Sequence, residues 1–382
     1  MLRLTFAAAV AGLVLASQPA AAQQKPVPIT ILAELSGDGT VSGTNFRDGA
    51  TLAFKEINAH GGILGRQVAL STYDTQSNPG IAKALAQKAV DSGAYVVLGP
   101  VYSGSVMVSM DVLKQAEIPD FTGGEAAAIT KRGDAYIFRT SFTQDNAMPR
   151  VARYMQDDMH VKKVAMIWVN NDFGKGGRDA IRKAFDERHV EVVADIPTDQ
   201  GQVDFSAPVL KAKQANADAV FVYLNEDESA RALKELRKQG YDKPIVGETT
   251  ICSQKVVELA GGAANGAICH VGLTPDAPDP TIKAYNAAFQ AAYHYKSDHN
   301  GMKGYSAAYI IKALTERLGK FDSKAFAQAM HGATFKVKDT PGVLMDVSFD
   351  DKGDIDRESF MVKVENNKQV VFKVLPPLGP QH

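Results

Sequence analysis

The chain contains 382 residues, and its 42 basic and 43 acidic side chains give a formal net charge of −1. This balance offers no basic surface of the kind that binds nucleic acids or anionic membranes. Hydrophobic residues account for 45% of the sequence and charged residues for 22%, which is typical of a globular protein, and the length is sufficient for two domains.

The first 22 residues predict a secretory signal peptide. Arg3 precedes an apolar run over residues 4–16, and an Ala-Ala-Ala cleavage site ends at Ala22. The run is shorter than the roughly 20 residues that a membrane-spanning helix needs, and no later segment is long and apolar enough to span. We therefore expect a soluble protein that is exported to the periplasm and does not insert into a membrane.

Strands and helices are expected to alternate from residue 29 to residue 139. Short apolar runs predict strands at residues 29–33, 67–73, 96–98, 118–122 and 136–139. Apolar residues at helical spacing predict helices whose buried faces cover residues 46–57, 81–89 and 106–113. The glycine-containing segment 35–45 is expected to be a loop.

A second alternating series follows residue 140. It predicts strands at residues 164–169, 190–196, 219–224, 245–247 and 267–271, with helices at 147–155, 178–188, 206–214, 228–239 and 254–260. Three prolines within residues 275–280 predict a linker. Helices at 281–296, 305–318 and 323–330 follow, then strands at 347–349, 359–364 and 370–374, the last two joined by a hairpin turn.

This order of elements predicts an α/β protein with two similar lobes. Strands that alternate with helices form parallel sheets covered on both faces, and each series supplies about five strands. The late helices and terminal strands are left over, so we expect the chain to return to each lobe. A cleft would then lie between the carboxyl ends of both sets of strands, where open α/β sheets bind ligands.

The stretch from Tyr95 to Ser105 is the first candidate for a ligand contact. It predicts a buried strand, a Gly-Pro turn, and a helix capped by Ser103 or Ser105. Free N–H groups at such a helix start favour an anion. A simple helix cap without a ligand is the alternative.

Two cysteines, Cys252 and Cys269, leave two possibilities open. An exported protein folds in an oxidising compartment, so a disulfide between them is permitted. Two buried, unpaired thiols are equally compatible with the sequence.

No enzymatic or metal-binding motif is present. The sequence lacks H-E-x-x-H, a P-loop, G-x-G-x-x-G and G-x-S-x-G. For His294 and His299, a solvated helix end is favoured over a metal site. We therefore expect no metal and no cofactor.

The segment from Glu56 to Arg66 resembles the helix-turn signature of periplasmic branched-chain amino-acid-binding proteins of ABC transporters. Similar features recur in order along the mature chain, namely Tyr73-Asp74, Leu98-Gly99-Pro100 with Ser103, residues 170–174, and Asp204-Phe205-Ser206. The resemblance implies a type I periplasmic-binding-protein fold, in which two Rossmann-like lobes are joined by three crossovers. It places the crossovers near residues 141–143, 273–275 and 344–346. Lobe 1 would comprise residues 23–142 and 275–345, and lobe 2 residues 143–274 and 346–382.

The resemblance also implies a set of ligand contacts. Ser103 matches the serine after the third strand that holds the ligand's carboxylate, and Gly123 matches a backbone carbonyl that holds its ammonium. Phe173 matches an aromatic residue that packs on the ligand from the second lobe. Asn225 follows the third strand of that lobe, where a polar or aromatic contact is usual, and Tyr102 and Ser42 are weaker lining candidates.

Two departures from the family pattern concern charge. Glu125 stands where serine or threonine is usual, and Thr249 and Thr250 stand where the family often has an acidic residue. Glu125 would repel a ligand carboxylate and attract an ammonium or amide group. Alternatively, it points into solvent or pairs with a lysine or arginine. If Glu125 contacts the ligand, there are two explanations. Either the site that binds the ligand's positive charge lies at a different position from that in the family, or the ligand is not a standard α-amino acid.

The leading hypothesis is a substrate-binding protein of an ABC importer that closes its lobes on a small amino acid, amide or organic acid. It would act as a monomer, deliver the solute to permease subunits, and catalyse no reaction. A ligand sensor with the same fold is one alternative. The other is an exported enzyme using Glu125 with Asp172 or Glu226.

Overall fold

The first lobe is built on a parallel sheet of five strands. The computed structural model describes residues 24–378, so the predicted signal peptide lies outside the described residues. The sheet order is β2-β1-β3-β4-β5, formed by β1 Val27–Ala33, β2 Val68–Asp74, β3 Val96–Leu98, β4 Asp120–Thr122 and β5 Ile137–Arg139. The order reverses between β1 and β3, which opens a crevice at their carboxyl ends.

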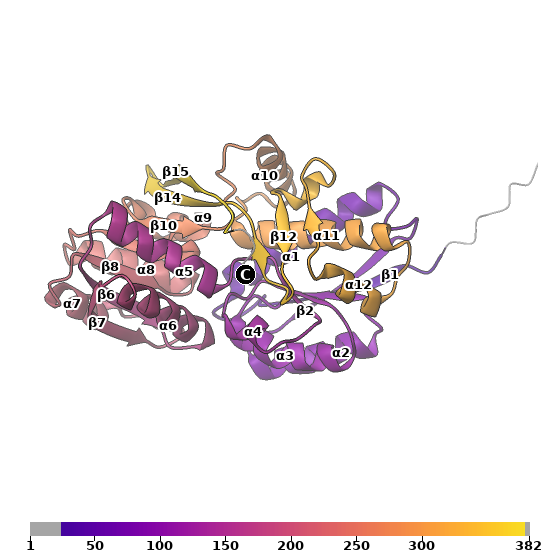
Figure 1. Ribbon diagram of the computed structural model, residues 1–382, viewed down its shortest axis with the longest axis horizontal. Coiled ribbons are helices and arrows are strands. Elements are labelled where there is room, and N and C mark those ends of the chain that lie inside the picture. The colour runs from indigo at the N-terminus through magenta and orange to yellow at the C-terminus, as the bar shows by residue number, and fades with distance from the viewer. Residues whose placement is uncertain (1–23, 379–382) are drawn as a thin grey trace, which may run out of the picture.

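Helices from both halves of the chain cover this sheet (Figure 1). The early helices are α1 Thr40–Ala59, α2 Pro79–Asp91, α3 Ser103–Gln115 and the short α4 Ala128–Lys131. The late helices are α10 Pro280–Tyr293, α11 His299–Leu318 and α12 Ser323–Met330. Helix α11 packs along α1, so the chain returns to the first lobe as expected.

The second lobe contains a sheet of seven strands in the order β15-β14-β10-β9-β8-β6-β7. Its parallel part is formed by β6 Lys163–Val169, β7 Glu191–Thr198, β8 Ala219–Tyr223, β9 Ile245–Glu248 and β10 Ile268–Val271. An antiparallel hairpin, β14 Ser359–Glu365 and β15 Lys368–Leu375, completes the sheet. The covering helices are α5 Gln144–Arg153, α6 Asp172–Asp186, α7 Ser206–Gln214, α8 Glu226–Lys238 and α9 Gln254–Ala260.

A parallel sheet of five strands in one lobe and five parallel strands within the seven-stranded sheet of the other confirm the predicted fold class. The two lobes lie side by side in Figure 1, with the chain passing between them more than once. The hairpin between β14 and β15 is also confirmed, since Asn366 and Asn367 take the positive φ angles, 50° and 59°, that a tight two-residue turn requires.

The chain returns to the second sheet later than expected. Strands β11 Thr334–Phe335, β12 Val347–Phe349 and β13 Ile355–Asp356 form a small antiparallel sheet. This sheet packs on β5, because the Arg139 N–H donates to the Gly353 carbonyl (2.9 Å) and Phe349 contacts Phe138. Residues 347–356 therefore stay with the first sheet, and the expected crossover at 344–346 is wrong by about ten residues.

Three helices begin six residues earlier than predicted, namely α1, α6 and α11. The sequence indicated loops there because glycines interrupt the pattern. Glycine instead permits close contact: a Cβ on Gly43 would lie 2.2 Å from the Glu34 carbonyl oxygen, and one on Gly304 2.2 Å from that of Phe46. These glycines bring α1 against β1 and α11 against α1.

Among residues 24–378, no helix combines the length and apolar character needed to cross a bilayer.

Candidate functional site

A small buried cavity lies between the two lobes, at the carboxyl ends of both parallel sheets. Its volume is about 30 Å³, and it is lined by Ser42, Val101, Tyr102, Ser103, Gly123, Glu125, Phe173, Glu226, Thr250, His299, Asn300 and Lys303. Seven of the nine residues predicted as ligand contacts are in this set. An outer groove of about 200 Å³ shares Tyr102, Ser103 and Phe173 with the cavity.

Ser103 is the first residue of α3 and does not cap it. Tyr102 occupies the N-cap position, and no side chain caps this helix start. The Ser103 hydroxyl oxygen instead accepts a hydrogen bond from the Ala126 N–H (3.2 Å), so its own proton is available to donate. The capping role expected for Ser103 or Ser105 is therefore wrong. The first N–H groups of α3 have no partner within the helix.

A buried ion pair between Lys303 and Glu125 lines the cavity. The Lys303 ammonium donates to Glu125 Oε1 (2.7 Å) and to the Gly123 carbonyl oxygen (3.3 Å). The two side chains are only 3% and 10% exposed. Burial raises the pKa of Glu125, and the Lys303 charge opposes that shift. Of the alternatives for Glu125, pairing with a lysine is the one that the structure shows.

Buried Arg139 fixes the turn that carries Gly123 and Glu125. Its guanidinium donates to the carbonyl oxygens of Gly124 (2.6 Å) and Ala126 (3.2 Å) and pairs with Asp354 (2.6 Å). Because its donors are directed at backbone carbonyls, at Asp354 and at the Thr130 hydroxyl (2.9 Å), Arg139 orients the turn and is not among the residues that line the cavity.

Glu34 positions the loop in front of α3 in the same indirect way. It follows β1 and is fully buried, and its two carboxyl oxygens accept from the N–H groups of Val101 and Tyr102, both at 3.1 Å. Burial raises the pKa of Glu34 to about 7. The tyrosine is fixed at its other end too, since its hydroxyl donates to the Asp38 carbonyl (2.8 Å).

The second lobe lines the cavity with the aromatic ring of Phe173 and with two polar side chains, Glu226 and Thr250. Phe173 stacks on Tyr223, with ring centroids 4.3 Å apart, and its ring lines the cavity. Glu226, the first residue of α8, accepts a hydrogen bond from the Asn300 amide across the cleft (3.3 Å). Burial, and then the nearby Asp298 charge, raise the pKa of Glu226 to about 8, so it is largely protonated at neutral pH.

Several polar atoms that line the cavity have no hydrogen-bond partner among the described residues. They are Thr250 Oγ1, His299 Nδ1 and Asn300 Oδ1, and the three residues are at most 5% exposed. Buried polar atoms are almost always paired, so these three indicate a polar ligand or bound water. Burial lowers the pKa of His299 far below its usual value, which keeps the ring neutral.

Two predicted contacts lie elsewhere. Thr249 lines an adjoining cavity of about 10 Å³, and its hydroxyl donates to Glu248 Oε1 (2.6 Å). Asn225 is the N-cap of α8 and forms a capping box with Glu228, and it is not among the residues that line the cavity. The strand does end there, but the asparagine starts the next helix, and its neighbour Glu226 reaches the cavity.

Five lining residues were not among the predicted ligand contacts, namely Val101, Glu226, His299, Asn300 and Lys303, although Glu226 was named as a possible catalytic acid. His294 and His299, the two histidines considered as a metal site, lie in different surroundings. His294 is the left-handed C-cap residue of α10, whereas His299 is buried at the start of α11. No group of three or more metal-ligating side chains occurs in the part of the chain that the structure describes.

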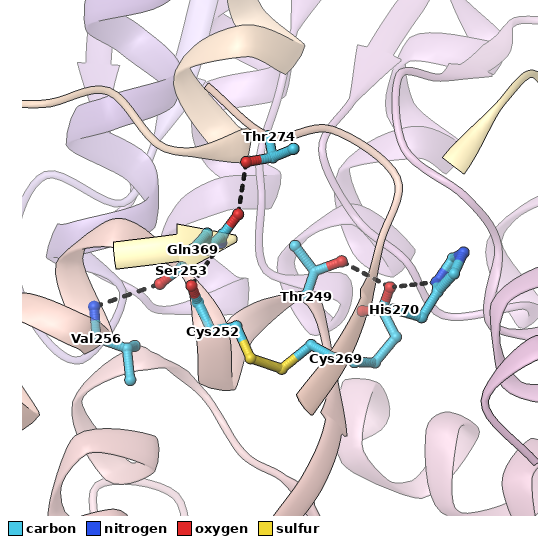
Figure 2. The surroundings of a disulfide bond; sticks show 9 residues. Thr249, Cys252, Ser253, Val256, Cys269, His270, Thr274 and Gln369 are labelled. Atoms are coloured by element: carbon cyan, nitrogen blue, oxygen red, sulfur yellow. Dashed lines mark hydrogen bonds and ion pairs between the residues drawn. A yellow bond between two sulfur atoms is a disulfide. The ribbon is translucent and has the colours of Figure 1, made fainter. Parts of the chain in front are cut away.

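A disulfide joins Cys252 to Cys269, which is the pairing that the sequence left open (Figure 2). Their Cα atoms are 6.2 Å apart. Cys252 ends the 3-10 turn Thr249–Cys252, and Cys269 lies on β10. The bond therefore ties the turn that carries Thr250 to the neighbouring strand.

The fold and the site together define a two-lobed α/β protein with a polar cavity between its lobes. A family described as periplasmic binding protein matches residues 26–369, and the chain belongs to that family.

Individual relatives show the same two-lobed class. A leucine-, isoleucine-, valine-, threonine- and alanine-binding protein of Pseudomonas aeruginosa is 28% identical over 94% of each chain. A branched-chain amino acid transporter substrate-binding protein of Streptococcus pneumoniae, solved with isoleucine, is 26% identical with a TM-score of 0.83, over 92% of this chain and all of that one. A Rhodopseudomonas palustris solute-binding protein, solved with benzoate, gives a TM-score of 0.85 at 21% identity, over 93% of this chain and 98% of its own.

Proposed function

We propose that this protein is the extracytoplasmic substrate-binding component of an ABC importer. The observation that supports this most strongly is the closed cavity, because both lobes line it and unpartnered polar atoms face it. A solute held there bridges the lobes and stabilises the closed arrangement through its higher affinity for that state. The protein itself performs no chemistry, and Glu125, the acid nominated for catalysis, is engaged by Lys303.

The ligand is a small amino acid or a small organic acid. The Pseudomonas aeruginosa and Streptococcus pneumoniae relatives carry amino acids in their names or structures, and the Rhodopseudomonas palustris protein was solved with benzoate. The protein acts in the periplasm as a monomer, and permease subunits are its partners.

The ligand contacts come from both lobes. In the first lobe they are Ser42, Tyr102, Ser103, Gly123 and the Glu125–Lys303 pair. In the second lobe they are Phe173, Glu226 and Thr250. The hinge consists of residues 141–143 and 273–275 together with residues 357–358, which replace the third crossover expected from the sequence.

Small-angle X-ray scattering of the purified protein tests the hinge mechanism. The radius of gyration should decrease when a solute is added that binds tightly by calorimetry. Candidate solutes are first selected by thermal shift over amino acids, amides and organic acids. An unchanged scattering profile with a tightly bound solute would contradict closure between lobes.

A further inference from the structure

Lys303 brings an ammonium group, paired with Glu125, into the cavity from the first lobe. Its ammonium group has three donors, and Glu125 Oε1 and the Gly123 carbonyl oxygen accept hydrogen bonds from two of them. The residue lines both the main cavity and the adjoining one. One N–H of a buried ammonium is thus available to a ligand atom.

Other donors surround the same part of the cavity. The Ser103 hydroxyl has its proton free, because its oxygen accepts from the Ala126 N–H. The N-terminus of α3 contributes unpaired N–H groups and the positive end of the helix dipole. A helix start alone would not define a site, but the same cavity is lined by buried Lys303 and by Thr250 and His299, whose Oγ1 and Nδ1 atoms have no partner among the described residues. Together these groups fit a carboxylate.

The charged acceptor that an ammonium group of a ligand would need is already engaged by Lys303, and Asn300 Oδ1 remains only as a neutral acceptor. Glu125 and the Gly123 carbonyl both bind the ammonium of Lys303. Glu226, the other acid in the cavity, accepts from Asn300 and is largely protonated at neutral pH. A ligand ammonium would therefore compete with Lys303 for its acceptors and be repelled by its charge.

We propose that Lys303 makes this cleft selective for small monocarboxylates without an α-ammonium group, such as 2-oxo acids and aromatic acids, over the corresponding α-amino acids. This inference depends on the proposed function and specifies its ligand class. The half-buried ring of Phe173, stacked on Tyr223, offers a flat apolar surface for the body of such an acid.

Matched ligand pairs test the inference on the unmodified protein. Calorimetry at pH 7.5, after unfolding and refolding to remove carried-over ligand, compares leucine with 4-methyl-2-oxopentanoate, alanine with pyruvate, and phenylalanine with phenylpyruvate and benzoate. At least one acid should bind about 10-fold or more tightly than its amino-acid partner, the minimum expected of one hydrogen bond to a charged group.

The lysine is tested by Lys303→Met, with Lys312→Met as the matched control. Lys312 lies on the same helix and pairs with Glu316 (2.6 Å), away from the cavity. Lys303→Met should weaken binding of the acid about 10- to 100-fold and reduce its advantage over the amino acid, whereas Lys312→Met should leave both affinities unchanged. Because the ligand pairs are first compared on the unmodified protein, a variant that fails to fold does not remove the test.

Two results would overturn the inference. One is an amino acid that binds at least 10-fold more tightly than its acid, with Glu226→Gln abolishing that preference, which would place an ammonium at Glu226. The other is failure of every acid to bind. Neither result refutes the proposed function, because scattering with any tightly bound solute decides lobe closure separately.

Discussion

Lys303 Nζ lies 2.7 Å from Glu125 Oε1, and the two residues are 178 positions apart in the sequence. The pair joins α11 to the turn after β4, so it connects the returning part of the chain to the sheet that it covers. Both side chains are at most 10% exposed. A buried pair of this kind does not guarantee stability, but removing one partner leaves the other charge uncompensated.

Lys303→Met should therefore destabilise the ligand-free protein. We expect the free energy of unfolding to fall by about 3–5 kcal/mol, the usual cost of leaving a buried charge without its partner. The double variant Lys303→Met with Glu125→Gln should recover part of this loss, because no unpaired charge remains. Urea unfolding followed by circular dichroism measures all three proteins. Lys312→Met, which removes a more exposed pair on the same helix, should change stability by less than about 1 kcal/mol. A loss no larger than the control's would contradict the role of the pair.

Ser103→Ala tests the polar contact at the start of α3. If the hydroxyl donates to a buried charged group of the ligand, the variant should bind the ligand about 1–3 kcal/mol more weakly by calorimetry. Ser109→Ala is the matched control, because Ser109 is buried on the same helix and its hydroxyl donates to the Val106 carbonyl (3.3 Å). Equal affinities for the two variants would restrict Ser103 to its hydrogen bond with the Ala126 N–H.

The sequence predicted the fold because strand and helix periods are local properties. Buried parallel strands such as β3 and β8 appear as continuous apolar runs, and Pro-rich residues 275–280 interrupt the pattern between the second series and the late helices. The predicted helix starts that were wrong are those that depend on tertiary contacts. The start of α11 is an example, since Gly304 lies where α1 packs so closely that a Cβ would be 2.2 Å from the Phe46 carbonyl oxygen.

The same error concealed three of the twelve residues that line the cavity, His299, Asn300 and Lys303. Lys303 precedes residue 305, at which the helix was predicted to start. The sequence therefore did not predict whether Lys303 lies on the buried or the exposed face of the helix. Extended backward, the buried stripe Ala307, Ile310 and Leu314 reaches Lys303 at helical spacing. That pattern would have indicated a buried lysine. Its partner Glu125 was recognised only as a departure from a family pattern, because no local signal connects two residues so far apart.

The disulfide should contribute measurably to stability. Cys252 and Cys269 are 17 residues apart, and closing a loop of this length restricts the unfolded chain by about 3 kcal/mol in the loop-entropy description. Reductant should therefore lower the urea midpoint of the native protein. A double Cys→Ala variant should show no effect of reductant. Thiol titration of the denatured protein should find no free thiol until reductant is added, and a titre of two without it would contradict the bond.

The buried carboxyl of Glu34 should make stability depend on pH. Its pKa rises on folding from 4.5 to about 7, mainly because burial disfavours the charged form. The folded protein therefore keeps a proton that the unfolded chain releases, so this contribution is complete below about pH 4.5 and is lost as the pH rises through 7.

Glu34→Gln cannot ionise and should lack this loss. Subtracting its unfolding free energy from that of the native protein isolates the group, because the other titrating residues are common to both. We expect the difference to shift in favour of the variant by about 3 kcal/mol between pH 4 and pH 8, on top of a constant offset from altered hydrogen bonds to Val101 and Tyr102. Parallel stability curves for the two proteins would contradict the prediction, because they would show that the pKa of Glu34 is the same in the folded and unfolded states.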